Sequence, residues 1–200
     1  ARLAAEVAAL RQENAGLRPA AQENNRLRAL LGFKQQQPFA TVAAAVIGRD
    51  PSQWFSSVLV DRGSRAGVRR NDPAVTADGL VGHVIEVGPG WSRVLLLLDP
   101  RSAVGIVVTR SREPGVAEGQ GQPALRIRYL ARDADVQPGD QIVTSGLGEI
   151  FPKNLVVGTV LGVSRGAGDM FQEAVVRPSA DLFHLEELLI IVRGDLPTAQ

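Results

Sequence analysis

The sequence predicts a mainly β protein with an N-terminal α-helix, in which a coiled-coil helix precedes two small, duplicated, six-stranded β-barrels. Apolar residues at the start of the chain recur at helical spacing, and the rest of the chain contains an approximate repeat of short valine-rich strands. Aromatic residues make up only 4% of the chain, while glycine numbers 21 and proline 12. This composition favours small barrels with short turns over a large helical core.

The first segment, residues 1–33, is predicted to be a coiled-coil helix. From Leu3 to Leu17 the seam residues are separated by steps of four and three, as at the a and d positions of a heptad, so the helix should pair through a narrow stripe. Pro19 lacks an N–H and disfavours helical geometry at Arg18, which predicts that the helix kinks or restarts there. The residues predicted to mediate self-association are Leu3, Val7, Leu10, Asn14 and Leu17 before the proline, and Leu27 and Leu31 after it.

Asn14 occupies a seam position and allows two interpretations. A buried asparagine lowers the stability of a coiled coil but favours one register and oligomeric state, most often a parallel dimer. Alternatively, Asn14 is a solvent-facing polar residue in a frayed helix end. The sequence leaves both interpretations open, and it does not distinguish a dimer from a filament.

Two stretches of the β region align with each other. In each copy Asn or Gly precedes an aspartate, a combination typical of turns, because Asn and Gly tolerate positive φ and Asp can hydrogen-bond to its own backbone. Each copy also has a glycine inside a valine-rich strand, which marks a bulge or a barrel corner. The alternative is chance similarity among valine-rich segments. The aligned residues are Val68, Asp72, Val75, Thr76, Val81, Gly82, Val84 and Val87 in the first copy, and Val136, Asp140, Val143, Thr144, Val157, Gly158, Val160 and Val163 in the second.

Twelve strands are predicted, and a boundary at Asp99-Pro100 divides them unevenly. Five precede the boundary, at residues 39–49, 54–60, 74–75, 80–87 and 92–98, and seven follow it, at 103–109, 115–119, 125–130, 142–144, 156–164, 171–177 and 185–192. The first barrel domain is predicted at 34–100, the second at 101–184, and a tail at 194–200. Because a barrel must close its edges, the strand within 185–193 could complete the first barrel and leave six strands in each.

Composition also limits the function. The net charge of +1 gives no electrostatic footprint for nucleic acid or an anionic surface, so proteins are the expected partners. Without cysteine there is neither a disulfide framework nor a thiolate site. The chain begins at Ala1 inside a helical pattern and has no apolar run long enough to cross a bilayer. We therefore expect membrane attachment only through an anchor outside this sequence.

No catalytic or metal-binding constellation is evident. A Ser-His-Asp triad needs a base, an orienting acid and a positioned nucleophile, and the candidates His83, His184 and Ser145 lack that signature. No two of His, Asp and Glu fall at ligand spacing with a third partner, and the paired glycines lack the context of a phosphate loop. We expect no catalytic residue, no metal and no cofactor. Hydrolysis that depends on His83 is a minor alternative.

Trp54 and Phe55 are the candidate partner-binding residues. Adjacent residues on a strand point to opposite faces, so one ring should fill the barrel and the other should lie outward. An outward aromatic side chain is a candidate anchor for a partner. Packing between the two barrels is the competing interpretation.

Several motifs, in this order, resemble those of the rod-shape-determining protein MreC family. They cover nearly the whole chain. One departure is Asn154, which stands where the family usually has glycine after Phe-Pro-x, and asparagine also tolerates left-handed geometry. The motifs are Glu23 to Phe33, Val46 to Pro51 with Trp54-Phe55, Asp61 to Ser64 with Gly67-Val68, Gly79 to Val84, Leu97 to Pro100, Gly139-Asp140, Thr144 to Gly148 and Phe151-Pro152.

The resemblance implies a non-enzymatic scaffold or regulator of the complex that elongates the cell wall of rod-shaped bacteria. It implies a single-pass inner-membrane protein whose coiled coil and barrels lie in the periplasm. Implied partners are a second copy, the elongation transpeptidase (a class B penicillin-binding protein), MreD and the MreB machinery. The family's barrels are similar to those of chymotrypsin-like proteases, without a triad.

The alternative is a periplasmic adaptor subunit of an efflux or secretion assembly, which also joins a coiled coil to small β domains. Such an adaptor normally has a helical hairpin flanked by two halves of a lipoyl-like domain. Here a single predicted helix precedes all the strands, which argues against the adaptor.

Overall fold

The structure, a computed structural model, describes residues 19, 22–32, 39–49, 56–164 and 170–192. The chain divides into a helical unit, residues 1–37, and a barrel unit, residues 38–200. Each unit is described by itself.

In the helical unit, residues 22–32 form a helix, with an ion pair between Glu23 and Arg26 one turn apart. Leu27 and Leu31 are four residues apart, hence on one face, and are 46% and 56% exposed. Pro19 itself is described but residues 18, 20 and 21 are not, so the kink or restart predicted there stays a prediction. The seam residues Leu3, Val7, Leu10, Asn14 and Leu17 lie outside the described residues. In the part of the chain that the structure describes, no helix is both long and apolar enough to span a bilayer.

The described part of the barrel unit has twelve strands and one short 3-10 helix, Ser64–Ala66. Valine-rich alternation forms the strands, and Gly, Pro and Asp end them. The bounds of β4 and β10 coincide with the predicted ones, and the others differ by a few residues. The strands are β1 (Thr41–Arg49), β2 (Ser57–Val60), β3 (Pro73–Val75), β4 (Leu80–Val87), β5 (Ser92–Leu96), β6 (Ala103–Val108), β7 (Pro114–Gly119), β8 (Leu125–Ala131), β9 (Gln141–Thr144), β10 (Val156–Ser164), β11 (Phe171–Pro178) and β12 (Glu187–Ile191).

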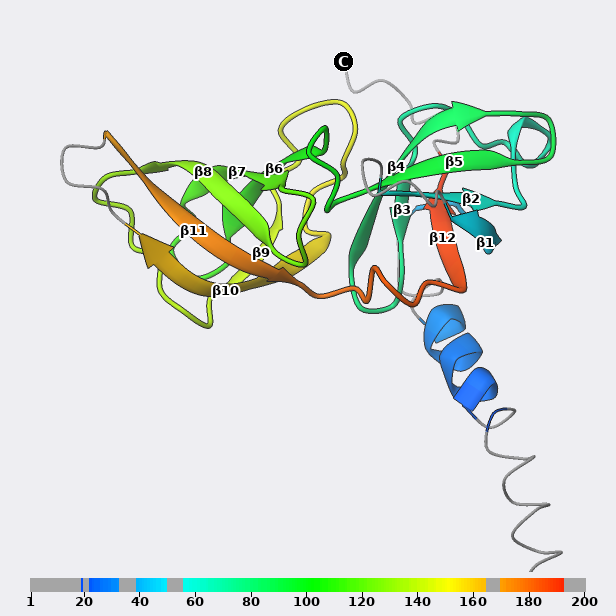
Figure 1. The fold of residues 1–200 in the computed structure, drawn as a ribbon, viewed down its shortest axis with the longest axis horizontal. Coiled ribbons are helices and arrows are strands. Elements are labelled where there is room, and N and C mark those ends of the chain that lie inside the picture. The colour runs from blue at the N-terminus through cyan, green and yellow to red at the C-terminus, as the bar shows by residue number, and fades with distance from the viewer. Residues whose placement is uncertain (1–18, 20–21, 33–38, 50–55, 165–169, 193–200) are drawn as a thin grey trace, which may run out of the picture. The chain divides into compact units, whose positions relative to one another are not determined.

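The strands form two closed antiparallel barrels of six strands each, which confirms the predicted fold class (Figure 1). The first has the neighbour order β1-β12-β3-β4-β5-β2 and the second β10-β11-β8-β7-β6-β9. β12 lies between β1 and β3, where Ile191 pairs with Thr41 and Ile190 with Ala74. The last strand of the chain therefore completes the first barrel.

The two barrels share one strand order with different starting points. When the strands of the second barrel are numbered one to six from β6 to β11, their order around the barrel is one, two, three, six, five, four. The first barrel has the same order when its numbering starts at β12 and continues with β1 to β5. The first barrel is therefore a circular permutation of the second.

Equivalent hydrogen bonds at the two aspartate turns support the predicted duplication. In each copy the Asp carboxylate accepts a hydrogen bond from the amide three residues earlier, and the Asp carbonyl accepts one from a valine of the second strand that follows, β4 or β10. The residue before the aspartate has positive φ in both copies, 70° at Asn71 and 93° at Gly139. The bonds are Arg69 N to Asp72 Oδ2 (2.7 Å) and Val84 N to Asp72 O (2.9 Å) in the first copy, and Gln137 N to Asp140 Oδ2 (2.9 Å) and Val160 N to Asp140 O (2.9 Å) in the second.

The strand glycines of the repeat are also equivalent. A Cβ at Gly82 would lie 1.8 Å from the carbonyl oxygen of Leu95, and one at Gly158 would lie 2.3 Å from that of Arg177. Both glycines therefore allow a close backbone approach that no other residue permits. Inside the barrels, branched aliphatic side chains fill the cores; among the largest fully buried ones are Leu80, Ile106, Leu125, Ile127, Leu130, Ile142, Leu188, Leu189 and Ile190.

The junction between the barrels is packed. Asp99 is buried, and its carboxylate accepts hydrogen bonds from the backbone amides of Ser56 (3.0 Å) and Arg101 (2.9 Å) and from the Arg101 side chain. Burial alone would raise the pKa of Asp99, but the hydrogen bonds from Arg101 and Ser56 outweigh it and lower that pKa. On the second barrel, a Cβ at Gly119 would lie 2.1 Å from the Asp99 carbonyl oxygen.

Candidate interaction surface

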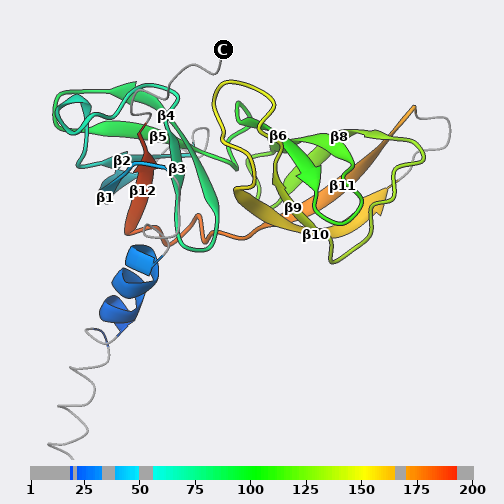
Figure 2. The same cartoon turned by 180° about the vertical axis from the view of Figure 1, so that it is seen from behind.

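The two aromatic residues predicted to bind a partner, Trp54 and Phe55, lie outside the described residues. In the described part of the chain, two exposed aromatic side chains meet where β8 pairs with β11. Tyr129 is 54% exposed and Phe171 46%, and their rings are perpendicular, with centroids 5.9 Å apart. With Arg128, Met170 and Glu173 they line a depression of about 220 Å³. We call these five residues the aromatic patch; β8 and β11 cross the second barrel side by side in Figure 2.

A β-bulge brings the patch residues to the surface. Leu130 pairs with Gln172 and Ile127 with Ala174, which leaves two residues of β8, Arg128 and Tyr129, opposite the single residue Glu173. Both bulged residues are exposed, although adjacent residues of a regular strand point to opposite faces. The bulge therefore turns the Tyr129 ring away from the barrel interior.

Tyr129 has a φ of +63°, in the left-handed region. For a residue with a bulky side chain this conformation costs about 1–2 kcal/mol. Such strain persists only where the surrounding structure imposes it, and it is concentrated at functional positions. An exposed ring held in a strained conformation therefore marks this surface as a candidate binding site.

Charged side chains border the rings. The Arg128 guanidinium lies 5.6 Å from the centre of the Tyr129 ring, within cation–π range. Its nitrogens are 3.5 Å from a Glu118 oxygen and 3.7 Å from a Glu173 oxygen, and Arg126 is also 3.7 Å from Glu173. These separations exceed those of a strong charge-assisted hydrogen bond, about 2.7–2.9 Å. Both arginine side chains are about half exposed and keep donor groups for another acceptor.

Beneath the patch, Gln172 supports the chain that leaves β8. It is only 1% exposed, and its amide nitrogen lies 2.8–3.0 Å from the carbonyl oxygens of Ala131, Arg132 and Ala134. A buried side-chain amide that satisfies several carbonyls fixes the local backbone. The backbone that follows the patch residues of β8 is therefore held in place.

The sequence offered one signal for this patch. Leu125, Ile127 and Tyr129 continue an alternating pattern, which places Tyr129 inward, yet Leu130 directly after it is apolar as well. Two adjacent core-type residues break the period of two, as a bulge does. The break does not by itself show which of the two residues lies outside.

Separate contacts are made by the three residues considered for a hydrolase, His83, His184 and Ser145. Ser145 Oγ accepts a hydrogen bond from the Leu147 amide (3.1 Å), and His83 Nδ1 is buried without a hydrogen-bond partner. The His83 ring meets Phe151 of the second barrel edge to face, with centroids 5.7 Å apart. Burial, and then the charge of Arg70, lower the pKa of His83. In the described part of the chain, no hydrogen bond joins either histidine to a serine; His184 pairs with Asp181 at 2.8 Å.

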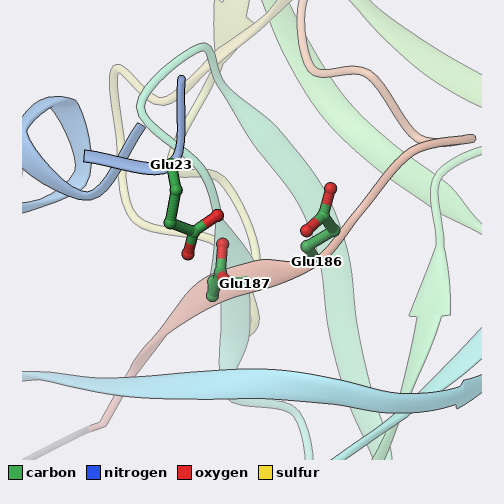
Figure 3. Close-up of side chains that lie close together, drawn as sticks. All are labelled: Glu23, Glu186 and Glu187. Atoms are coloured by element: carbon green, nitrogen blue, oxygen red, sulfur yellow. The ribbon is translucent and has the colours of Figure 1, made fainter. Parts of the chain in front are cut away.

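Figure 3 shows the carboxylates of Glu23, Glu186 and Glu187. Glu187 begins β12 and Glu186 directly precedes it, whereas Glu23 belongs to the helical unit. Because the position of the helical unit relative to the barrels is not determined, these three carboxylates define no metal site.

Two closed six-stranded barrels in one chain define the class as a double-barrel β protein. Residues 46–192 match the family described as rod shape-determining protein MreC, barrel core. The chain belongs to the MreC family, which comprises cell-shape proteins and not enzymes.

The curated relatives and solved structures agree. The cell shape-determining protein MreC of Escherichia coli (strain K12) is 35% identical over 175 residues, 87% of this chain and 48% of the relative, and that of Caulobacter vibrioides is 34% identical over 80% of this chain and 46% of the relative. The chain thus spans about half the length of the curated relatives it matches. The crystal structure of MreC from Pseudomonas aeruginosa superposes with a TM-score of 0.73 at 35% identity, over 76% of this chain and 99% of that chain.

Two further solved structures that resemble this chain are described as part of a filament and as a complex with another protein. One is described as the major periplasmic domain of the cell shape-determining filament MreC, with a TM-score of 0.69 at 25% identity, over 79% of this chain and 98% of that chain. The other is a complex between the penicillin-binding protein PBP2 and MreC from Helicobacter pylori, with a TM-score of 0.63 at 19% identity, over 78% of this chain and 99% of that chain. At 19% identity the likeness concerns the fold.

Proposed function

We propose that this chain is the extracytoplasmic part of a scaffold in the complex that elongates the bacterial cell wall. It maintains rod shape without catalysis, by associating with itself and by binding the elongation transpeptidase, a class B penicillin-binding protein. Membership of the MreC family supports the role in cell shape. The structural observation that carries the binding role is the strained, exposed aromatic patch.

The patch has the properties of a partner-binding surface. Its rings are exposed, but the bulge and the edge-to-face contact between them restrain them, so binding would cost little side-chain entropy. Tyrosine and arginine are enriched among residues that dominate binding energy, especially where a pocket excludes water. The PBP2 complex of the H. pylori family member supports a penicillin-binding protein as the partner.

Self-association is proposed to use the helical unit. Leu27 and Leu31 expose one apolar face, and an isolated helix of this kind gains stability by pairing. The predicted seam at Leu3, Val7, Leu10, Asn14 and Leu17 would extend the same contact. A family relative described as a filament supports assembly beyond the single chain. Contacts with MreD and the MreB machinery are proposed on family membership alone.

The proposed location is the periplasm, with attachment to the inner membrane through a segment outside this sequence. The family structure described as a periplasmic domain supports this location. The alternative of an efflux or secretion adaptor is not retained, because the chain belongs to the MreC family.

Binding to the transpeptidase is tested with immobilised chain and the purified ectodomain of a class B penicillin-binding protein. Tyr129→Asn should lower the affinity at least about tenfold, because an aromatic anchor contributes about 2 kcal/mol or more at a hot spot. Asparagine tolerates left-handed φ, so the backbone can keep its shape. Ile47→Asn is the matched control, since Ile47 is 57% exposed on the first barrel. Equal retention of the ectodomain by both variants would exclude the patch, and no binding by the folded wild type would exclude this partner.

Self-association is tested by sedimentation of the full chain and of a Leu10→Asp, Leu17→Asp double variant. Charges on an apolar seam oppose pairing, so the variant should sediment as a monomer at concentrations where the wild type associates. If both chains are monomeric at high concentration, the coiled-coil role is wrong.

A further inference from the structure

We infer that the aromatic patch binds an extended protein segment in which a carboxylate lies two residues away from an apolar, preferably aromatic, side chain. This inference rests on the proposed function, in which the patch is the partner-binding surface. The apolar side chain fills the depression between Tyr129, Met170 and Phe171, and the carboxylate pairs with Arg128 at its border.

The size of the depression selects a side chain over a free small molecule. Its volume is about 220 Å³, whereas sites for small molecules and cofactors usually enclose about 300–1,000 Å³. Met170 and the two rings supply the apolar lining, and Met170 is 77% exposed. Methionine adapts its shape to different partners, and an incoming ring can pack edge to face as Tyr129 and Phe171 already do. One aromatic or large aliphatic side chain is the occupant that matches this space.

The charges at the border select an acidic neighbour. Arg126 and Arg128 bring two guanidinium groups to the patch, and their contacts with Glu118 and Glu173 are no shorter than 3.5 Å. A guanidinium has five donors in a fork that suits a carboxylate, and a partner carboxylate at about 2.8 Å would bind more strongly than these contacts. The stacking of Arg128 on Tyr129 places its donors directly beside the depression.

The spacing follows from geometry. In an extended segment, residues i and i+2 project from the same face about 6.8 Å apart. The Arg128 guanidinium and the Tyr129 ring centre are 5.6 Å apart, so the two recognition elements of the patch are separated by a similar distance. A segment with Glu-x-Trp or Trp-x-Glu therefore meets both elements, whereas directly adjacent residues would point to opposite sides.

The patch does not suit a polyanion. The two arginines are accompanied by Glu118 and Glu173, so the local formal charge is close to zero, and the chain as a whole carries +1. Nucleic acids and anionic lipid surfaces need a cluster of uncompensated cations. A single carboxylate beside an apolar group fits the balance of charges better. A second copy of this chain presenting such a segment is an outcome that the test distinguishes.

The test is a titration of the isotopically labelled 200-residue chain, followed through backbone amide shifts. The probe is a capped peptide with the core Glu-Gly-Trp between Gly-Ser flanks; two comparison peptides have Gln-Gly-Trp and Glu-Gly-Ala cores. We expect saturable shifts, at millimolar peptide, of amides in β8 and β11. Loss of the carboxylate should weaken binding about two- to fivefold, as for a partly exposed ion pair, and loss of the ring about tenfold or more.

Variants of the chain test which side chain of the patch recognises the carboxylate and which recognises the ring of the peptide. Arg128→Gln should weaken the Glu-Gly-Trp peptide to the level of Gln-Gly-Trp and leave Gln-Gly-Trp unaffected, which a merely structural role would not do. Arg93→Gln is the matched control, since Arg93 also pairs with a glutamate but lies on the first barrel. Tyr129→Asn should abolish binding of all three peptides.

Three results would overturn the inference: equal binding of Glu-Gly-Trp and Gln-Gly-Trp, saturable shifts outside β8 and β11, or no saturable shift at all. A fourth result would assign the surface to a second copy of the chain and overturn the inference as well. In that case the concentrated chain without peptide would show shifts confined to the patch, and it would sediment as a dimer that Tyr129→Asn abolishes.

The proposed function can fail separately from this inference. If the peptides bind as expected but the transpeptidase ectodomain does not, only that partner is wrong; if the ectodomain binds without any need for Arg128 or a carboxylate, only this inference is wrong.

Discussion

The two barrels have the same strand order and the same aspartate turns, but they differ in how the chain enters them. The second barrel is continuous, from Ala103 to Pro178, whereas the first is closed by β12, almost a hundred residues after β5. In the described part of the chain, only the second barrel carries two exposed aromatic rings that contact each other. The duplication therefore preserved the backbone hydrogen bonds that build a barrel, while connectivity and surface diverged.

This difference separates stability from binding. In the first barrel, the strand that comes last in the sequence supplies part of the core, so integrity depends on a distant segment. In the second, Tyr129 takes a left-handed φ at a surface bulge, where its side chain lies outside the core. We therefore expect the first barrel to respond most to changes in connectivity, and the second to tolerate changes at its patch.

Removal of β12 should have the largest effect. Deleting residues 187–200 takes four side chains that are at most 2% exposed, Leu188 to Ile191, out of the first barrel. Truncating one such side chain costs about 2–5 kcal/mol, and a whole domain is stable by only about 5–15 kcal/mol, so the first barrel should unfold. Hydrogen exchange should show lost protection in β1 to β5 and retained protection in β6 to β11. A chain that ends after Val192 is the control, and exchange in both barrels at once would show that they fold only together.

Alanine at the strand glycines should break either barrel alone. Gly82→Ala and Gly158→Ala place a Cβ 1.8 Å and 2.3 Å from a backbone carbonyl oxygen, and overpacking typically costs about 1–3 kcal/mol. Urea unfolding should show the larger loss for Gly82→Ala, where the contact is closer. Gly162→Ala is the control, because nothing lies within 4 Å of its Cβ position. Comparable losses at all three positions would argue for a general effect of glycine replacement in strands.

The burial of His83 should make the stability of the barrel unit depend on pH. Burial and Arg70 lower the pKa of His83 from its usual 6.5, so the unfolded chain takes up a proton at higher pH than the folded chain does. The His83 contribution is complete above about pH 6.5 and is lost as the pH falls toward the lowered pKa. Urea unfolding at several pH values should show a steeper decline in stability below about pH 6.5 in the wild type than in His83→Phe. Parallel profiles would mean that His83 keeps its ordinary pKa.

Tyr129→Asn should have the smallest effect on stability. Relief of the left-handed strain, about 1–2 kcal/mol, roughly offsets the lost contact with Phe171, about 0.5–1.5 kcal/mol. The free energy of unfolding, from urea titration, should change by less than about 1 kcal/mol. The neighbouring Leu130→Ala, at a fully buried position, should cost about 2–5 kcal/mol. A large loss for Tyr129→Asn would mean that the ring supports the barrel.

Local features were predictable from the sequence, and features that depend on distant contacts were not. Valine alternation and Gly, Pro and Asp turns are properties of neighbouring residues, and they located all twelve described strands. Asn154 was expected to tolerate left-handed geometry and has a φ of 70°. The aromatic patch was not predicted, because Tyr129 follows an alternation that assigns it to the core. Trp54 and Phe55 lie outside the described residues, so their role in partner binding stays a prediction.

The sequence by itself determined the fold class, the duplication and the family, because turn chemistry, strand periodicity and motif order are encoded in short stretches. The tertiary structure alone decided that β12 completes the first barrel and that Tyr129 faces solvent. Both depend on register between strands far apart in the chain: β12 pairs with β1 and β3, and the bulge exists only because β8 has one residue more than the β11 segment opposite it. Pairing of this kind is a property of the closed sheet and of no single strand.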